Sequence, residues 1–199
     1  MRLKRVDDGA FQGCRELARV VFGATELSVQ LGYLGKQAFS RCTGLLEADL
    51  SRCLELECID ASTFHGCSAL ASVRLPSSLV VVKHSAFRMC WKLTDVNLSS
   101  CTALERIGKL AFADCGALGA VDLSGCTSLV SIAVDAFSGC SALHKLLLPA
   151  QFDGRLPELP PKCKTSREPA YGGATYWAPT LRTAAPNGRS TPRRGDATG

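Results

Sequence analysis

Apolar and polar residues alternate in short segments that recur through the first 149 residues of the chain. Most copies read Leu-x-x-Val-x-Leu or a close variant, as in Leu93–Leu98 and Leu118–Leu123. Alternation with a period of two predicts a short β-strand that turns Val and Leu inward and the intervening residues outward. Pro76 and Pro149 in two copies, and Ser-x-Cys in others, are expected to end the strand.

A second motif, Ala-Phe-x-x-Cys-x-x-Leu, precedes each alternating segment. Ala, Phe and Cys at i, i+1 and i+4 fit about one helical turn that faces inward, and Thr63 replaces Ala in one copy. The phenylalanines follow one another at intervals of 28, 25, 23, 25 and 25 residues. One unit has no partner for its apolar side, so stacked units are expected to share a continuous core. The predicted core ladder consists of Phe11, Phe39, Phe64, Phe87, Phe112 and Phe137, with Cys14, Cys42, Cys67, Cys90, Cys115 and Cys140.

The repeat resembles the BspA-like class of leucine-rich repeats. The pattern of that class is Ala-Phe-x-x-Cys-x-x-Leu-x-x-Val-x-Leu-Pro followed by a short Leu-x-x-Ile-Gly segment, here Leu104–Gly108. The resemblance implies a leucine-rich-repeat domain over residues 1–149. Its expected fold class is an α/β, horseshoe-like solenoid of short parallel strands with one helical turn per coil. Members of the class are typically surface or adhesion-type protein binders, so a protein or peptide partner is implied as well.

The composition changes at about residue 150. Residues 150–199 hold seven of the nine prolines, and Gly, Ser, Thr and Arg lie between them. Such a segment buries too little apolar surface to offset the ordering of the chain, which predicts a disordered Pro/Gly/Arg-rich tail. Arg189, Arg193 and Arg194 could contact phosphates or an acidic partner. No aromatic residues interleave with them, so a solvated tail is favoured and no nucleic-acid partner is expected.

Nine of the eleven cysteines hold repeat positions, namely the six of the ladder and Cys53, Cys101 and Cys126. Parallel in-phase side chains suit packing better than the torsion of a disulfide, so small buried thiols are expected. Only Cys53 and Cys58 approach a zinc-ligand spacing, and neither a metal nor another cofactor is expected. Free thiols favour a reducing, cytoplasmic compartment, and the sequence shows neither a secretory signal nor a membrane span.

The outward residues of the strands are expected to form a concave face with an acidic centre. The candidate ligand-binding residues there are Glu47, Asp49, Arg74, Asp95, Asn97 and Asp122. Carboxylates in this arrangement favour recognition of a basic or polar protein segment. The sequence contains no phosphate-binding loop, nucleophile elbow or paired-carboxylate site, so the predicted function is protein–protein interaction without catalysis.

An alternative function uses the ends of the solenoid. Leu3–Val6 aligns with Leu104–Ile107, so the first coil starts in mid-repeat. An uncapped end exposes strand edges and core residues to any matching surface. The chain would then be a fragment or assembly element of a larger repeat protein, with a structural or adhesive role and end-to-end self-association.

Overall fold

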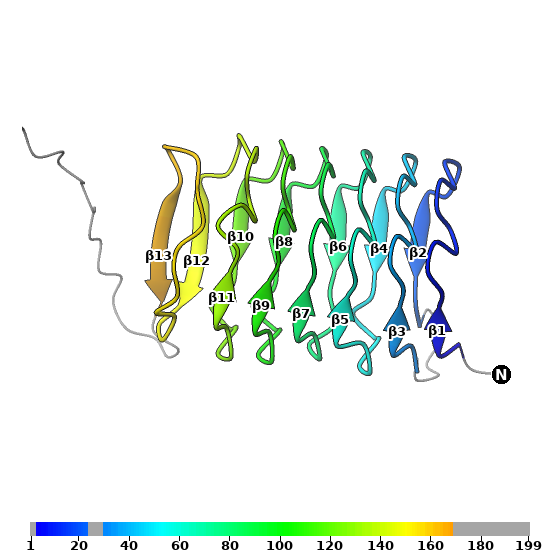
Figure 1. Cartoon of the computed structure of the whole chain (residues 1–199), viewed down its shortest axis with the longest axis horizontal. Helices are drawn as coiled ribbons and strands as arrows, with labels where there is room; N and C mark the ends of the chain where they lie inside the picture. Colours follow the sequence, from blue (N-terminus) through cyan, green and yellow to red (C-terminus); the bar gives the residue numbers. More distant parts are fainter. Residues whose placement is uncertain (1–2, 24–29, 169–199) are drawn as a thin grey trace, which may run out of the picture.

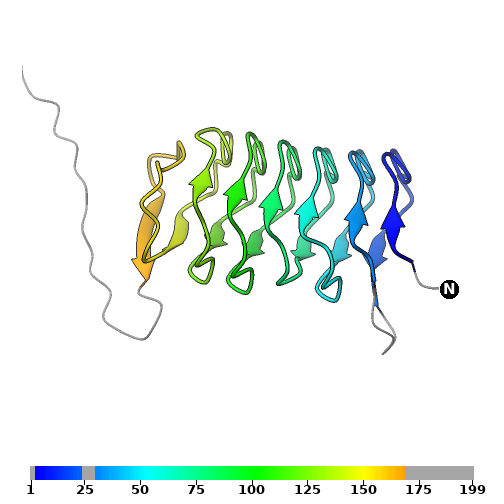
Figure 2. The same ribbon diagram turned by 60° about the horizontal axis from the view of Figure 1, so that its bottom comes forward.

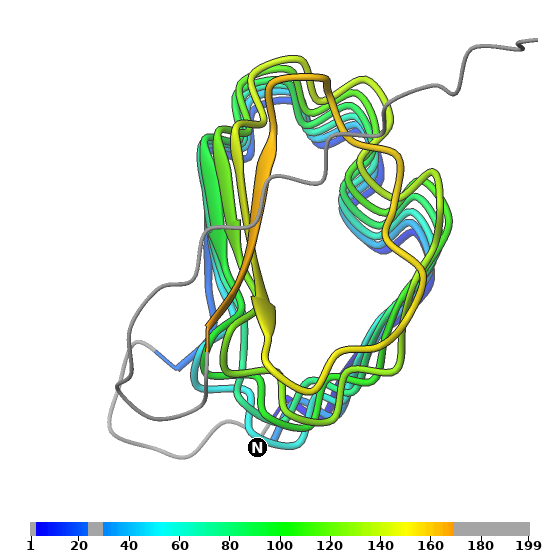
Figure 3. The same cartoon turned by 90° about the vertical axis from the view of Figure 1, so that its left-hand side faces the viewer.

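The fold is a parallel β-solenoid. The computed structural model describes residues 3–23 and 30–168, and its coils follow one another along a nearly straight axis (Figures 1 and 2). The horseshoe-like arc expected from the sequence is therefore replaced by a straight stack. Viewed along the axis, the stacked coils form a wall of longer strands, a wall of short strands and a wall of turns (Figure 3).

The long-strand wall contains strands of three to five residues in parallel register. In chain order they are β2 (Arg19–Val21), β4 (Glu47–Asp49), β6 (Ser72–Arg74), β8 (Asp95–Asn97), β10 (Ala120–Asp122), β12 (Lys145–Pro149) and β13 (Lys164–Glu168). The central residue of each three-residue strand is buried, as Val96 and Val121 are in β8 and β10. The alternation in the sequence thus correctly predicts which residues face the core.

The short-strand wall lies across the core from the long strands. Its members are β1 (Arg5–Val6), β3 (Tyr33–Leu34), β5 (Cys58–Ile59), β7 (Val81–Val82), β9 (Arg106–Ile107) and β11 (Ser131–Ile132). Each of these strands turns its second residue into the core. A ladder runs without a break from β5 through β7 and β9 to β11.

The turn wall consists of the Ala-Phe-x-x-Cys segments, and the predicted helical turn is wrong: none of the described residues is helical. In the coil of Phe39, the amides of Phe39 and Arg41 donate to Thr63 and His65 of the next coil, at 2.9 and 2.7 Å. The alternate amides, of Ala38, Ser40 and Cys42, donate back within the turn. In a helix, every one of these amides would donate to a carbonyl of the same segment. Every second amide is committed to the neighbouring coil, so the chain forms a tight turn instead.

Six phenylalanine rings form one continuous stack through the turn wall. Successive ring centroids lie 5.1–5.5 Å apart with nearly parallel planes, the offset arrangement that aromatic rings prefer. Phe39, Phe64, Phe87, Phe112 and Phe137 are buried, whereas Phe11 is 41 % exposed. The stack therefore has an open face at its N-terminal end.

The solenoid continues beyond the boundary that composition predicts at residue 149. Residues 150–168, which the sequence analysis assigns to the disordered tail, form a last coil in which Phe152 is buried and β13 pairs with β12. This coil is shorter because it passes the turn wall as Leu159-Pro160-Pro161-Lys162-Cys163, without an Ala-Phe-x-x-Cys turn. The rest of the predicted tail, residues 169–199, lies outside the described residues.

Candidate binding surfaces

The first candidate surface is the outward side of the long-strand wall. Strand register places Glu47 between Arg19 and Ser72, and Asp49 between Val21 and Arg74. Further along the wall, Asp95 lies beside Ala120, and Asn97 beside Asp122. All six residues selected from the sequence thus lie on one side of one wall, because residues two apart in a strand point the same way. Leu147 of β12 lies beside Asp122 in the same register, where alternation predicts an outward side chain, but it is buried.

Two of the carboxylates on this wall are paired with arginine. Arg19 Nε lies 3.2 Å from Glu47 Oε2, and Arg74 Nη1 lies 3.6 Å from Asp49 Oδ2. Both guanidinium groups are largely exposed, so each pair contributes little to folding. The N-terminal half of the wall is consequently a mixed-charge surface, less acidic than the sequence suggests.

Asp49, Asn97 and Asp122 also have a structural role that the sequence analysis missed. Each accepts hydrogen bonds through Oδ1 from the backbone N–H and the hydroxyl of the serine two residues later, at 2.6–3.0 Å. These bonds form an Asx turn that ends the strand. The signal in the sequence is Asp/Asn-Leu-Ser at the position where Arg74-Leu75-Pro76 stands in another copy.

The serine bonds hold the carboxylates of Asp49 and Asp122 in a fixed orientation, and they favour the ionised form of Asp49. Burial acts to raise the pKa of Asp49, but the two bonds from Ser51 and the charge of Arg74 outweigh it, and the pKa lies below its usual range. Oδ2 of Asp122 has no partner among the described residues. Asp95 is exposed and receives only a long bond of 3.5 Å from Thr94 within the described chain. Asp95 and Asp122 therefore offer free acceptors on neighbouring strands.

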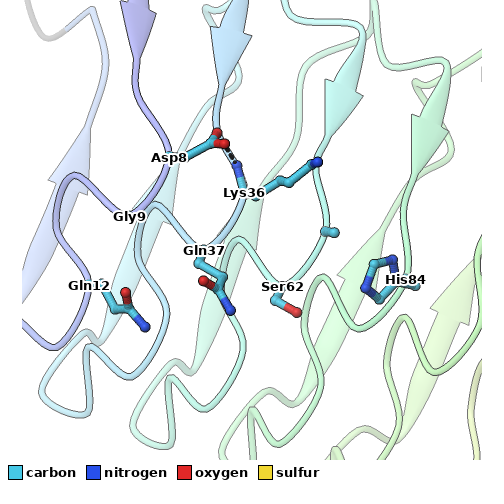
Figure 4. A pocket seen from close by; sticks show the side chains of 8 residues that line it. Asp8, Gly9, Gln12, Lys36, Gln37, Ser62 and His84 are labelled. Carbon is cyan, nitrogen blue, oxygen red and sulfur yellow. Dashed lines mark hydrogen bonds between the residues drawn. The ribbon is translucent and has the colours of Figure 1, made fainter.

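The second candidate surface is an open groove of about 450 Å³ on the turn side of the short-strand wall (Figure 4). It crosses the first four coils. Its lining contains Asp8, Gly9, Gln12, Lys36, Gln37, Ala61, Ser62 and His84. These residues occupy related positions shortly before or after the phenylalanine of each copy, so the repeat phase could have revealed the groove; the sequence analysis did not consider it.

One acidic residue anchors this groove. Asp8 Oδ1 accepts hydrogen bonds from the Tyr33 hydroxyl at 2.7 Å and from the Lys36 backbone N–H at 2.9 Å. The Tyr33 bond, followed by the Lys36 bond, places the pKa of Asp8 below its usual range. The side chains of Gln12, Gln37, Ser62 and His84 make no hydrogen bond within the described part of the chain, and the charge of Lys36 acts on Asp8. The groove is polar and solvated, with no aromatic platform.

The ladder cysteines are hydrogen-bond donors. Cys42, Cys67, Cys90, Cys115 and Cys140 each direct Sγ at the carbonyl of the phenylalanine in the preceding coil, at 3.0–3.2 Å. Burial raises the pKa of Cys67 and of Cys126 to about 12, so these thiols are protonated at neutral pH. All eleven cysteines are free, and Cys14 alone in the ladder is exposed. Residues 3–23 and 30–168 contain no cluster of His, Cys, Asp and Glu suited to a metal ion.

Comparisons with known proteins agree with this architecture. The model of the BspA type leucine-rich repeat region matches residues 1–116 and 33–154, with six copies. No curated protein matches the sequence. Within the described residues, no helix is long and apolar enough to cross a membrane.

Two bacterial leucine-rich-repeat structures are similar to this chain. The protein from Bacteroides ovatus is 26 % identical, has a TM-score of 0.69, and aligns over 84 % of this chain and 41 % of its own length. The leucine-rich-repeat protein of T. pallidum is 29 % identical, has a TM-score of 0.57, and aligns over 68 % of this chain and 60 % of its own. The chain thus spans less than two thirds of either protein.

Proposed function

Because this chain belongs to the BspA-type leucine-rich-repeat family, we propose that it is a non-catalytic protein-binding module that acts through its long-strand wall. The observation that carries the proposal is the set of outward-facing carboxylates on the long strands, among which Asp49 and Asp122 are held in a fixed orientation by serine hydrogen bonds. Acceptors that are already oriented lose little freedom on binding, and they favour N–H donors. The partner is a basic or polar polypeptide segment. The free thiols support a reducing compartment for the complex.

Arg74 completes the recognition surface. It lies between the paired carboxylates of the N-terminal half and the free acceptors of Asp95 and Asp122. Opposite charges at the centre and the flank of one wall fix the register of a bound segment, because a displaced segment meets like charges. Asn97 supplies an uncharged side chain between Arg74 and Asp122 along the wall.

The test is affinity capture with the full chain and two sets of charge-neutralising variants. Glu47→Gln, Asp49→Asn, Asp95→Asn and Asp122→Asn remove four negative charges from the wall, and the asparagines introduced at positions 49 and 122 retain the Asx turns as Asn97 does. The control set is Glu16→Gln, Glu55→Gln, Glu57→Gln and Asp153→Asn, all at exposed positions away from the outward side of the long strands. Quantitative mass spectrometry should find proteins that the wall variant loses and the control retains. Equal capture by both sets would exclude the wall as the binding surface.

A second candidate function is assembly through the N-terminal end of the solenoid. Leu3 is 53 % exposed and Phe11 is 41 % exposed, so a ring face of the stack and part of the first coil lie open. Exposed core residues at the end of a repeat stack are covered by a cap or by another stack. Light scattering of the full chain over a range of concentrations tests this: association that Phe11→Ser weakens supports it, and a monomer throughout excludes it.

A further inference from the structure

Neighbouring turns in the turn wall are joined by two hydrogen bonds that recur in the same way. The amide of each phenylalanine and the amide two residues later donate to two carbonyls of the following coil. The five pairs are Phe11 and Gly13, Phe39 and Arg41, Phe64 and Gly66, Phe87 and Met89, and Phe112 and Asp114. All ten donor–acceptor distances lie between 2.7 and 2.9 Å. In all five pairs, two carbonyls that lie two residues apart in the following coil accept from these amides.

The sixth pair has no acceptor. The amides of Phe137 and Gly139 lack a hydrogen-bond partner in the described chain. The cause is the shortened last coil, because Leu159, Pro160 and Pro161 replace the segment that would carry the two carbonyls. Phe137 is only 1 % exposed, and a backbone N–H in such a position is rarely left without a partner.

An open pocket of about 250 Å³ lies where the missing turn would be. We call it the terminal notch; it is lined by Phe137, Ser138, Gly139, Cys140, Ser141, Glu158, Leu159 and Pro160. Its lining includes a carboxylate and no cation, which disfavours an anionic ligand. Because the Phe137 side chain is already buried, the notch leaves no space for a further aromatic ring to stack on it.

We propose that the terminal notch binds an extended segment of a partner polypeptide through two main-chain carbonyls two residues apart. The donors are the amides of Phe137 and Gly139, and the bound segment takes the place that Ala136 and Ser138 take against Phe112 and Asp114. The residue between the two carbonyls is small. Recognition through main-chain bonds resembles the addition of a strand to a sheet edge. This site is independent of the long-strand wall, so either proposal can fail alone.

The experiment is amide NMR of the ¹⁵N-labelled full chain titrated with the neutral peptide acetyl-Gly-Ala-Gly-Ser-Gly-amide. The amide protons of Phe137 and Gly139 should shift downfield and exchange more slowly, because they gain acceptors. Those of Phe112 and Asp114, already bonded, should not move. Replacing the central glycine of the peptide by phenylalanine should weaken the effect. Absence of shifts at Phe137 and Gly139, or equal shifts in every turn, would overturn the proposal.

A pair of matched variants separates the notch from a general effect of the peptide. Ser141→Trp puts an indole at the notch, and Ser68→Trp puts one at the equivalent position of a coil whose amides are already bonded. Trp91 occupies this position naturally and is 54 % exposed, so both variants should fold. Ser141→Trp should weaken peptide binding by about tenfold or more, and Ser68→Trp should leave it unchanged. Equal affinities in both variants would overturn the assignment.

Two further outcomes have defined meanings. If Phe137 and Gly139 are already protected from exchange before peptide is added, the occupant is this chain itself, and the proposal of a partner is wrong. The wall variant described above should bind the peptide with unchanged affinity. Loss of binding in that variant would contradict the independence of the two surfaces.

Discussion

At the scale of single residues, the turn wall depends on residues with positive φ. Two residues after each phenylalanine, φ lies between 59 and 75°, and the residue is glycine in three of the six copies. Arg41, Met89 and Asp114 occupy the other three. A residue with a Cβ is strained in this region by about 1–2 kcal/mol, which glycine avoids at some entropic cost. The exposed Arg41 therefore pays a conformational penalty without a compensating ion pair among the described residues.

Replacing Arg41 by glycine should stabilise the protein by about 0.5–1 kcal/mol, the relief of strain less the added freedom of the unfolded chain. The opposite change, Gly139→Ala, should destabilise it, because φ is 75° and the new methyl group would crowd Asp114. Urea unfolding followed by circular dichroism measures both. A lower midpoint for Arg41→Gly would contradict the argument.

The buried thiols link stability to alkaline pH. Burial raises the pKa of Cys67 and Cys126 to about 12, whereas the unfolded chain has thiols of pKa near 8.5. A raised pKa means that the folded state holds its proton more tightly, so this stability is fully present below about pH 8.5 and is lost as pH rises towards 12. Melting temperatures measured from pH 7 to 11 should fall above pH 9. Cys67→Ala should melt with a smaller fall over that range.

At the scale of elements, the ends of the long strands are fixed by side chains that look like ligand-binding groups. Asp49, Asn97 and Asp122 bond the serine two residues later, while proline ends the strand at Pro76. The alternation of the sequence locates the strands but does not distinguish an outward carboxylate that binds a partner from one that closes a turn. Both roles use the same residue types at an exposed strand end.

Substitutions at Asp122 separate the two roles. Asp122→Ala removes both bonds to Ser124 and should destabilise the protein by about 1–2 kcal/mol. Asp122→Asn keeps an acceptor in the same place and should be nearly neutral, while it removes the charge that a partner would meet. Chemical denaturation gives the stability of each variant, and affinity capture gives its binding. Equal stability of the two variants would show that the Asx turn contributes nothing.

The turn wall shows where spacing alone misleads. Ala, Phe and Cys at i, i+1 and i+4 face one way both in a helical turn and in the observed turn, so side-chain periodicity cannot tell them apart. The difference lies in the amides, which pair between coils. Hydrogen bonds between segments 23–28 residues apart leave no local signal beyond glycine at some positive-φ positions.

At the scale of the whole molecule, the repeat correctly predicts a stack of coils. The composition of residues 150–199, however, places the end of the solenoid too early in the chain. Proline, which argues for a tail, serves in residues 150–168 to shorten the last coil: Pro160 and Pro161 cross the turn wall without the amides of an ordinary repeat. The register of β13 on β12 shows that this coil still follows the stack. A Pro-rich segment can therefore be either a disordered tail or a terminal coil. Composition does not separate the two, whereas the pairing of the segment with a strand of the stack does.

A linear stack makes the effect of a mutation depend on its position along the axis. Phe87 has a ring on each side, with centroids 5.3 and 5.2 Å away, and is fully buried, whereas Phe11 stacks on Phe39 alone and is 41 % exposed. Phe87→Ala should therefore cost about 3–5 kcal/mol, the usual range for a buried phenylalanine. Phe11→Ala should cost only about 1–2 kcal/mol, from one lost ring contact and partial burial.

The comparison of these two variants tests whether the N-terminal end is open in solution. Urea denaturation at several protein concentrations should give a large, concentration-independent loss for Phe87→Ala and a small one for Phe11→Ala. If Phe11→Ala instead loses as much as Phe87→Ala, the exposed ring is covered in solution. A loss that grows with protein concentration would assign the cover to a second molecule, because the wild-type protein alone would then gain stability by mass action. A loss independent of concentration would place the cover within the same chain.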